Sequence, residues 1–315
     1  MPFKKPDPLI TLIIIAVILA IFVPIHGQAA EWFSLAIKLA IALLFFLYGA
    51  RLSTREALAG LKHWQLHITI LCFTYILFPL IGWALAPSAN WIGQELYLGI
   101  LYLTLVPSTV QSSVAFTSIA RGDVAGAIVS ASASNLLGVV ITPVLVMLLM
   151  TQESVIIDGG VFLDISIQLL LPFILGQLFR PLVKDIAENK TTKVVDRGSI
   201  AMVVYSAFSA GVIEGIWNRV GVLEILGLII FSIGLVASML WLTDFIAKKL
   251  RFAKTHRIAI QFCGTKKSLA TGLPMAAVIF GGSNIGILIL PLMIFHQVQL
   301  MMCAALASQY ARLSE

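Results

Sequence analysis

Residues 263–274 read CGTKKSLATGLP and interrupt a run that is otherwise apolar. The interruption holds two adjacent lysines, Lys266 and Lys267, and ends at Pro274. If the run crosses a membrane, each charged side chain near its centre costs about 2.5–3.5 kcal/mol even on the lenient insertion scales. Both lysines are therefore expected to face a polar interior, and the helix that carries them is expected to be broken.

A second interruption lies about half a chain earlier. Residues 107–113 read PSTVQSS and follow the mainly apolar stretch 96–106. Thr109 aligns with Thr265 at an offset of 156 residues, and Thr142-Pro143 echoes Leu290-Pro291 at an offset of 148. Matched broken helices in two halves are the sequence pointer to a secondary transporter whose site lies where the breaks meet. The alternative is a pair of kinked helices packed through small polar residues, with no site.

The composition indicates a membrane protein. Of 315 residues, 59% are hydrophobic and 11% are charged, whereas soluble domains carry about 25% charged residues. A disordered chain, a disulfide scaffold and an ordinary soluble enzyme are thereby excluded. Ten apolar segments are long enough to cross a bilayer. They lie at about 8–25, 31–51, 64–86, 95–120, 123–150, 161–181, 195–213, 221–247, 253–280 and 283–311.

These segments predict an all-α polytopic membrane protein with ten transmembrane helices. Residues 1–315 are expected to form a single transmembrane domain of two repeats, about 8–150 and 161–311. Because each repeat has five helices, an odd number, the second is expected to be inverted relative to the first. Residues after the first segment, near Gly27, leave open that this segment is a cleaved signal peptide.

Basic residues predict the orientation. Of 21 Lys and Arg residues, 17 fall in the two tails and alternate loops, three fall within segments, and only Arg219 falls in the opposite loops. By the positive-inside rule both termini are expected in the cytoplasm. Short loops favour a bacterial inner membrane. The scattered basic residues are not a nucleic-acid patch, and nucleic acid is not expected as a partner.

Several classes of chemistry lack their motifs. No phosphate-binding Gly-x-x-x-x-Gly-Lys-[Ser/Thr] loop is present, so ATP is not expected as an energy source. The cysteines Cys72, Cys263 and Cys303 stand in apolar runs without metal-ligand spacing. We therefore expect neither a cofactor nor an enzyme. An intramembrane enzyme acting on lipid would need a nucleophile beside a base, and a cation–proton antiporter would need a mid-membrane carboxylate near the crossing.

Other polar residues add to the candidate site. The fifth segment carries several serines and Asn135, for which close helix packing is the competing interpretation. The tenth carries His296 and Gln297 after Pro291. The full set of candidate residues for binding substrate or ion is Ser108, Thr109, Gln111, Ser112, Ser113, Ser130, Ser132, Asn135, Thr265, Lys266, Lys267, Ser268, His296 and Gln297.

These motifs resemble a known family. The stretches VPSTVQSS at 106–113, ARGD at 120–123, CGTKKSLATG at 263–272 and FHQ at 295–297 are similar to the bile acid:sodium symporter family, and the lysine motif to its solute carrier 10 member 7 branch. The resemblance implies ten helices, with a panel of helices one, two, six and seven and a core of the other six. Helices four and nine would cross at their breaks. It also implies sodium-coupled transport of an organic anion by alternating access.

Only some of the family's site residues match this sequence. Ser113 matches a crossover serine, and the resemblance implies sodium, if bound, at Ser113 and Ser132. The family's acidic position in helix nine falls on Phe262, and its Gln-Asn pair falls on Lys266 and Lys267. At least one lysine is therefore predicted to stand in the place of a sodium ion. Sodium coupling, proton coupling and uncoupled transport stay open.

The sequence thus predicts a secondary transporter of a small organic anion, with membrane lipid around it. The crossing stretches are expected to face one another across a polar cavity. The alternative is a membrane-embedded regulator or ligand-binding protein of the same fold that has lost transport.

Overall fold

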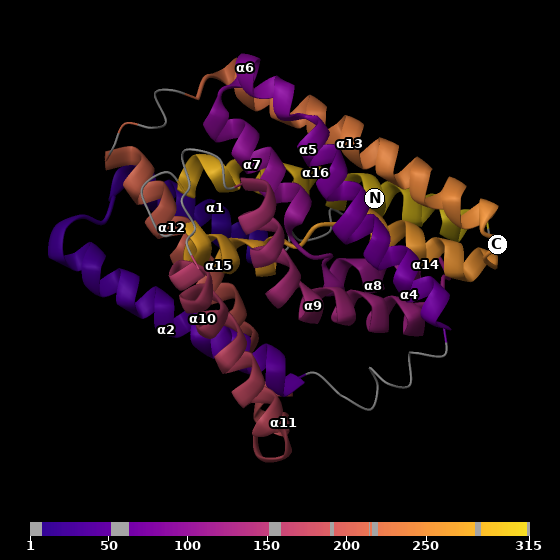
Figure 1. The fold of residues 1–315 in the computed structure, drawn as a ribbon, viewed down its shortest axis with the longest axis horizontal. Coiled ribbons are helices and arrows are strands. Elements are labelled where there is room, and N and C mark those ends of the chain that lie inside the picture. The colour runs from indigo at the N-terminus through magenta and orange to yellow at the C-terminus, as the bar shows by residue number, and fades with distance from the viewer. Residues whose placement is uncertain are drawn as a thin grey trace. The chain divides into compact units, whose positions relative to one another are not determined.

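The computed structural model describes residues 8–51, 63–150, 159–189, 192–213, 215, 220–280 and 285–313. Every regular element in these ranges is helical, as the composition predicts (Figure 1). The elements are α1 Pro8–Phe22, α2 Gly27–Arg51, α4 Trp64–Cys72, η2 Phe73–Leu77, α5 Phe78–Ala84, η3 Ala86–Ser88, α6 Ala89–Ile92, α7 Gln94–Leu105, α8 Val110–Ile119, α9 Val124–Met150, α10 Gly159–Leu178, α11 Arg180–Glu188, α12 Lys193–Ile213, α13 Val222–Lys249, α14 Lys254–Thr265, α15 Leu269–Phe280 and α16 Ile285–Arg312.

Five helices of the described part are long and apolar enough to cross a membrane: α2, the continuous stretch Trp64–Ile92, α9, α13 and α16. The pair α7 and α8 forms a sixth span if its bend of 61° is counted within one crossing. Helices α1, α10 and α12 contain shorter apolar stretches, and α14 with α15 occupies the segment expected at 253–280. Ten crossings and an inverted repeat therefore stay predictions.

The chain divides into two compact units. The first comprises Met1–Arg51, Leu163–Gly221 and Leu273–Ile287, and includes α1, α2, α11 and α12. Within it α12 packs against α1 and α2, and α11 packs against α2. Gly49 of α2 and Gly176 of α10 allow close packing, because a Cβ atom at either would collide with a carbonyl oxygen of the other helix. Small residues at such contacts are typical of membrane helix pairs.

The second unit comprises Leu52–Phe162, Val222–Gly272 and Leu288–Glu315. Its centre is α14, which contacts α4, α8, α9 and α13 (Figure 1). Leu273–Ile287, which follows the second interruption along the chain, belongs to the first unit, and the panel and core that the family resemblance implies stay a prediction. Both interruptions, at 106–109 and 266–268, lie in the second unit.

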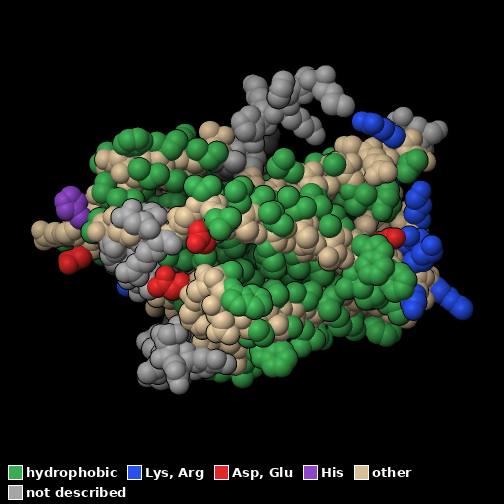
Figure 2. Space-filling view, turned by 90° about the horizontal axis from the view of Figure 1, so that it is seen from above, with side chains coloured by type: hydrophobic (Ala, Val, Ile, Leu, Met, Phe, Trp, Pro, Cys, Tyr) green, Lys and Arg blue, Asp and Glu red, His purple; other side chains and the backbone are tan. Residues whose placement is uncertain are grey.

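Large apolar side chains are exposed along the long helices. Examples are Leu148 of α9, Ile230 of α13 and Trp241 of α13, which are 66%, 69% and 65% exposed. Figure 2 shows hydrophobic side chains over most of the face in view. An apolar surface of this extent fits a lipid environment and not water. The described helices are thus those of an integral membrane protein.

Candidate functional site

The first interruption separates α7 from α8. Helix α7 ends at Leu105, and Val106 and Thr109 are extended, with ψ angles of 156° and 138°. Proline explains the break, because Pro107 lacks an N–H and disfavours helical conformation in the residue before it. The sequence predicted this interruption from the proline and the serines that follow it.

The second interruption separates α14 from α15. Helix α14 ends at Thr265, and Lys266 is extended with φ −93° and ψ 152°. Hydrogen bonds join the two interruptions and the helices beside them. The N–H of Ser268 donates to the carbonyl of Pro107 at 2.7 Å, Ser108 Oγ donates to the carbonyl of Cys263 at 2.7 Å, and Ser113 Oγ donates to the carbonyl of Phe262 at 3.3 Å. The structure therefore brings together the two stretches that the sequence paired.

Five consecutive carbonyls at the first break, from Thr104 to Ser108, all accept hydrogen bonds. In chain order their donors are Lys267 Nζ at 2.8 Å, Thr142 Oγ1 at 2.9 Å, Lys267 Nζ at 2.9 Å, the N–H of Ser268 at 2.7 Å and Asn135 Nδ2 at 2.6 Å. Backbone groups released by a helix break cannot remain unpaired away from water. The first break is thus held by contacts from α9 and from the second interruption. The sequence predicted a polar cavity between the two interruptions, whereas here they are in direct contact.

Lys267 is fully buried, and its Nζ donates three hydrogen bonds to backbone carbonyls. The acceptors are Thr74, Thr104 and Val106, at 2.9, 2.8 and 2.9 Å. Nζ also lies 4.3 Å from the centroid of the Phe78 ring, a cation–π distance. These partners replace the water that a lysine loses on burial.

The carbonyl of Thr74 is available because of the π-helix η2. In a regular α-helix it would accept from residue 78, but the N–H of Phe78 donates to Phe73 instead. In the π pattern its donor would be residue 79, which is Pro79 and has no N–H. A proline in α5 thereby frees the oxygen that Lys267 uses, and π-bulges are frequent at functional sites.

Lys266 is also fully buried, but its surroundings are different. Among the described residues, Nζ has no hydrogen-bond partner. It lies 3.9 Å from the centroid of the Phe116 ring and 5.7 Å from that of Phe262. Aromatic faces attract a cation but do not replace the hydrogen bonds that an ammonium loses on leaving water. The ammonium of Lys266 is therefore buried at this site without a hydrogen-bond acceptor among the described residues.

Helix α9 places Asn135, one of the candidate residues, and also Ser134 at the first break. Asn135 Nδ2 donates to Ser108, while Asn135 Oδ1 accepts from Thr271 Oγ1 at 2.8 Å. Ser134 Oγ accepts from the N–H of Ser108 at 3.1 Å. Ser130 instead contacts His67 Nδ1 at 2.6 Å, and Ser132 is only half-buried. Ser134, which shares a helix face with Ser130, is the serine that reaches the break, and not Ser132.

Helix α16 contributes Gln299 and not the predicted Gln297. The side chain of Gln299 accepts from the N–H of Lys267 at 2.9 Å and donates to the carbonyl of Lys267 at 2.8 Å. Its Nε2 also lies 2.9 Å from Nδ1 of the predicted residue His296. Gln297 is half-buried. The amide of Gln299 thus supplies the hydrogen bonds that a helix would have supplied to the backbone of Lys267, which lies between α14 and α15.

The remaining predicted residues divide into two groups. Thr109, Thr265 and Ser268 are buried at the breaks, and the Oγ of Ser268 accepts from the backbone N–H of Thr271 at 3.2 Å. Gln111 is exposed, and its place opposite the second stretch stays a prediction. The Oγ of Ser112 is buried and has no hydrogen-bond partner within the described part of the chain.

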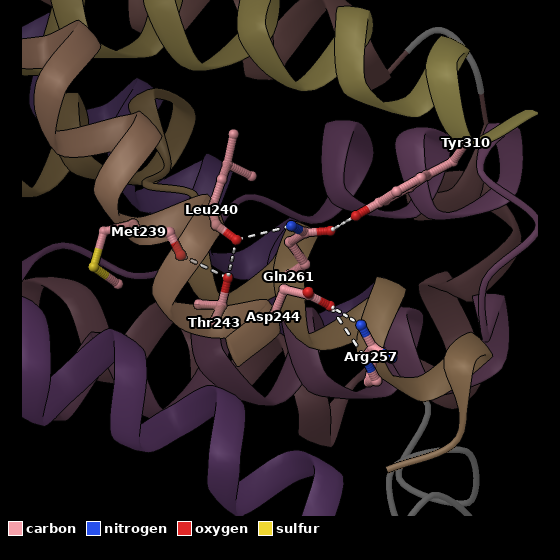
Figure 3. A network of polar contacts seen from close by, with 7 residues as sticks. All are labelled: Met239, Leu240, Thr243, Asp244, Arg257, Gln261 and Tyr310. Atoms are coloured by element: carbon pink, nitrogen blue, oxygen red, sulfur yellow. Dashed lines mark hydrogen bonds and ion pairs between the residues drawn. The ribbon is translucent and has the colours of Figure 1, made fainter. Parts of the chain in front are cut away.

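A polar network fixes the start of α14, as Figure 3 shows. Gln261 donates to the carbonyl of Leu240 at 2.8 Å and accepts from the hydroxyl of Tyr310 at 2.9 Å. Arg257 pairs with Asp244 at 2.7 Å. These contacts tie α14 to α13 and α16, so the stretch that carries both lysines is anchored at its beginning.

Sodium at Ser113 and Ser132 has no support in this geometry. The Oγ of Ser113 is engaged with the carbonyl of Phe262, and that of Ser132 belongs to a half-buried side chain. The carbonyl oxygens that would suit a cation at the first break already hold the ammonium of Lys267. In the ranges that the structure covers, no three His, Cys, Asp or Glu side chains group as metal ligands.

Comparison with known proteins places the chain among membrane transporters. The model of a family described as "SBF-like CPA transporter family" matches residues 7–312. An uncharacterized protein of Pseudomonas aeruginosa is 49% identical, over 99% of this chain and 95% of its own. The Escherichia coli K12 protein named "Putative symporter YfeH" is 45% identical, with the same coverage. The rat protein named "Sodium/bile acid cotransporter 7" is 31% identical, over 85% of this chain and 81% of its own. None of these descriptions supports a regulator that has lost transport.

Proposed function

This chain belongs to the SBF-like CPA transporter family, and from that premise we propose that it is a secondary active transporter of a small organic anion that works by alternating access. The site is the crossing of the two interruptions in the second unit. A membrane transporter of this family has no reaction to catalyse, so the work of the site is to bind, occlude and release.

The observation that carries the proposal is the ammonium of Lys266. It is fully buried and, within the described residues, lacks any hydrogen-bond acceptor. An anionic group on a substrate would supply both the opposite charge and the acceptors. Charge-assisted hydrogen bonds of this kind are about twice as strong as neutral ones. A carboxylate or a similar small anion is therefore the substrate group that the site suits.

Burial of Lys266 also supports alternating access. In this conformation its side chain has no exposed surface, so an anion from water cannot reach it. Binding requires a second conformation in which Lys266 is uncovered. The interruptions suit such a change, because their backbones are held mainly by side chains and not by a continuous helical ladder.

The two lysines make a coupling sodium ion unnecessary for binding an anion. Two positive charges about 4 Å apart repel by about 4 kcal/mol at an effective dielectric constant of about 20. A sodium ion near these ammonium groups would thus bind almost a thousandfold more weakly than at a neutral site. We infer that uptake is independent of sodium, and that a proton on Lys266 is the coupling charge if the transport is driven by an ion gradient.

The membrane arrangement that goes with this function has ten crossings in one domain, residues 1–315, with repeats of about 8–150 and 161–311. Both termini lie in the cytoplasm and the membrane is a bacterial inner membrane. The basic residues near the ends of α13, α14 and α16 support this orientation.

The test is uptake by purified protein in proteoliposomes, screened with small carboxylates and other organic anions. We expect uptake of at least one anion at equal rates in sodium and choline salts, and its loss in Lys266→Ala. Lys249→Ala is the matched control, because Lys249 also lies on an aromatic ring, 5.0 Å from Phe245, but is exposed. Anion uptake that survives in Lys266→Ala, or that requires sodium, would contradict the proposal.

A further inference from the structure

Three backbone carbonyls from two separate parts of the chain converge on one point, and a lysine occupies that point. Thr74 belongs to η2, whereas Thr104 and Val106 belong to the end of α7 and the break after it. Nζ of Lys267 lies 2.8–2.9 Å from all three oxygens. We propose that these oxygens form a site for a monovalent cation and that Lys267 fills it with a cation tethered to the chain.

The number of hydrogen bonds at Nζ indicates the protonation state of Lys267. A neutral amine has two N–H groups, whereas an ammonium has three. Nζ donates to three carbonyls, so all three hydrogens of the ammonium are used. The Phe78 ring, 4.3 Å away, presents a further surface that favours positive charge.

The oxygens themselves are of the type that binds unhydrated cations. Rings of backbone carbonyls replace the hydration shell of an ion in channel filters. In broken transporter helices, unwound carbonyls and the ends of half-helices coordinate monovalent cations. Here Thr104 and Val106 lie at the C-terminal end of α7, where the helix dipole is negative. Without the ammonium, three buried carbonyls would lose their partner at once.

The neighbouring Lys266 shows that contact with three carbonyls is a property of position 267 and not of every buried lysine. Lys266 is equally buried, but within the described part of the structure its Nζ has no hydrogen-bond acceptor. Lys266→Ala removes an ammonium and leaves no set of unpaired carbonyls. It is therefore the matched control for Lys267→Ala. The cation site is tested by thermal stability, whereas anion transport is tested by uptake. A negative result in one experiment therefore does not decide the other.

The experiment restores the deleted atoms from solution. Lys267→Ala removes three methylene groups and the ammonium, which together correspond to n-propylammonium. Melting temperature is measured in detergent extract at constant ionic strength, with propylammonium, ammonium, sodium or potassium chloride. Choline chloride, which is too bulky for the site, and neutral propanol are the controls.

We expect Lys267→Ala to melt several degrees below the wild type and to be stabilised saturably by propylammonium or a small monovalent cation. Choline and propanol should have no such effect. The wild type and Lys266→Ala should show no difference between sodium and choline, because in both the site is filled by Lys267.

A second variant keeps the test decisive if Lys267→Ala yields no folded protein. Lys267→Met fills most of the volume without charge, and we expect it to be destabilised and insensitive to propylammonium. Wild-type stability in Lys267→Met would overturn the proposal, because the carbonyls would then need no cation. Saturable stabilisation of the wild type by sodium, retained in Lys266→Ala, would overturn it as well.

Discussion

The backbone N–H of Ser268 donates to the carbonyl oxygen of Pro107 at 2.7 Å, across 161 positions of the chain. Each residue stands at the point where its own helix stops. Pro107 ends α7 because it cannot donate, and its carbonyl is left without a helical partner. Ser268 immediately precedes α15, where N–H groups are likewise unpaired within the helix. Each break therefore supplies the hydrogen-bond partner that the other lacks.

The contact of Gly138 with this break gives a first prediction. A Cβ atom at position 138 would lie 2.6 Å from the Tyr75 hydroxyl and 2.8 Å from Cβ of Pro107. Gly138→Ala should therefore destabilise the protein by about 1–3 kcal/mol, the usual cost of overpacking. The control is Gly234→Ala in α13, where nothing lies within 4 Å of the added atom. Helix propensity predicts that this control gains up to about 1 kcal/mol. Equal melting temperatures of the two variants would contradict the close packing of Gly138 against Pro107.

Thr142 gives a second prediction. Its hydroxyl donates to the carbonyl of Leu105 at 2.9 Å, and both residues are fully buried. Thr142→Val keeps the volume but leaves that carbonyl unpaired, which should cost about 1–3 kcal/mol. Thr74→Val is the control, because the Thr74 hydroxyl donates to Ile70, a carbonyl that also accepts from the backbone of its own helix. A melting temperature of Thr142→Val as high as that of Thr74→Val would show that the break does not need this donor.

Tyr310 gives a third prediction, drawn from the network in Figure 3. Tyr310→Phe removes the donor to Gln261 Oε1 and should lower stability by about 1 kcal/mol, the net value of one such bond. The loss should disappear in a Gln261→Leu background, where the acceptor is gone. Additive losses in the double variant would mean that this hydrogen bond contributes nothing to holding α14.

The orientation gives a fourth prediction. Single cysteines at Ser88 and Lys190, on a background without the three native cysteines, should react differently with a membrane-impermeant thiol reagent in intact cells. Position 88 should be labelled and position 190 should be silent, because basic loops stay in the cytoplasm. Position 190 lies outside the described residues, whereas Ser88 ends η3. Labelling at 190 with silence at 88 would reverse the orientation.

The sequence places the helix breaks well because their causes are local. Pro107 excludes a helical predecessor whatever its surroundings, and clustered polar residues at 263–268 cannot continue an apolar helix through lipid. The charge asymmetry and the apolar runs likewise follow from composition along the chain. The family, the all-helical class and the pairing of the two interruptions were therefore within reach of the sequence.

The sequence could not predict which residues of the neighbouring helices face the breaks. The sequence predicted Ser132 and Gln297 for the site, whereas Ser134 and Gln299 reach the breaks. In both cases the correct residue lies two positions further along a helix. Since each residue turns a helix by about 100°, two positions lie on nearly opposite faces. Only the packing of α9 and α16 selects the face.

The sequence alone determined that two lysines stand at a helix break inside an apolar chain, because both facts are written in residue order. It did not determine that they differ. Lys267 reaches three carbonyls from η2 and α7, while Lys266 lies against the rings of Phe116 and Phe262. Successive side chains on extended backbone point to opposite sides. Apart from Phe262, the partners of the two lysines come from residues more than 100 positions away along the chain. That difference between the two lysines belongs to the tertiary structure.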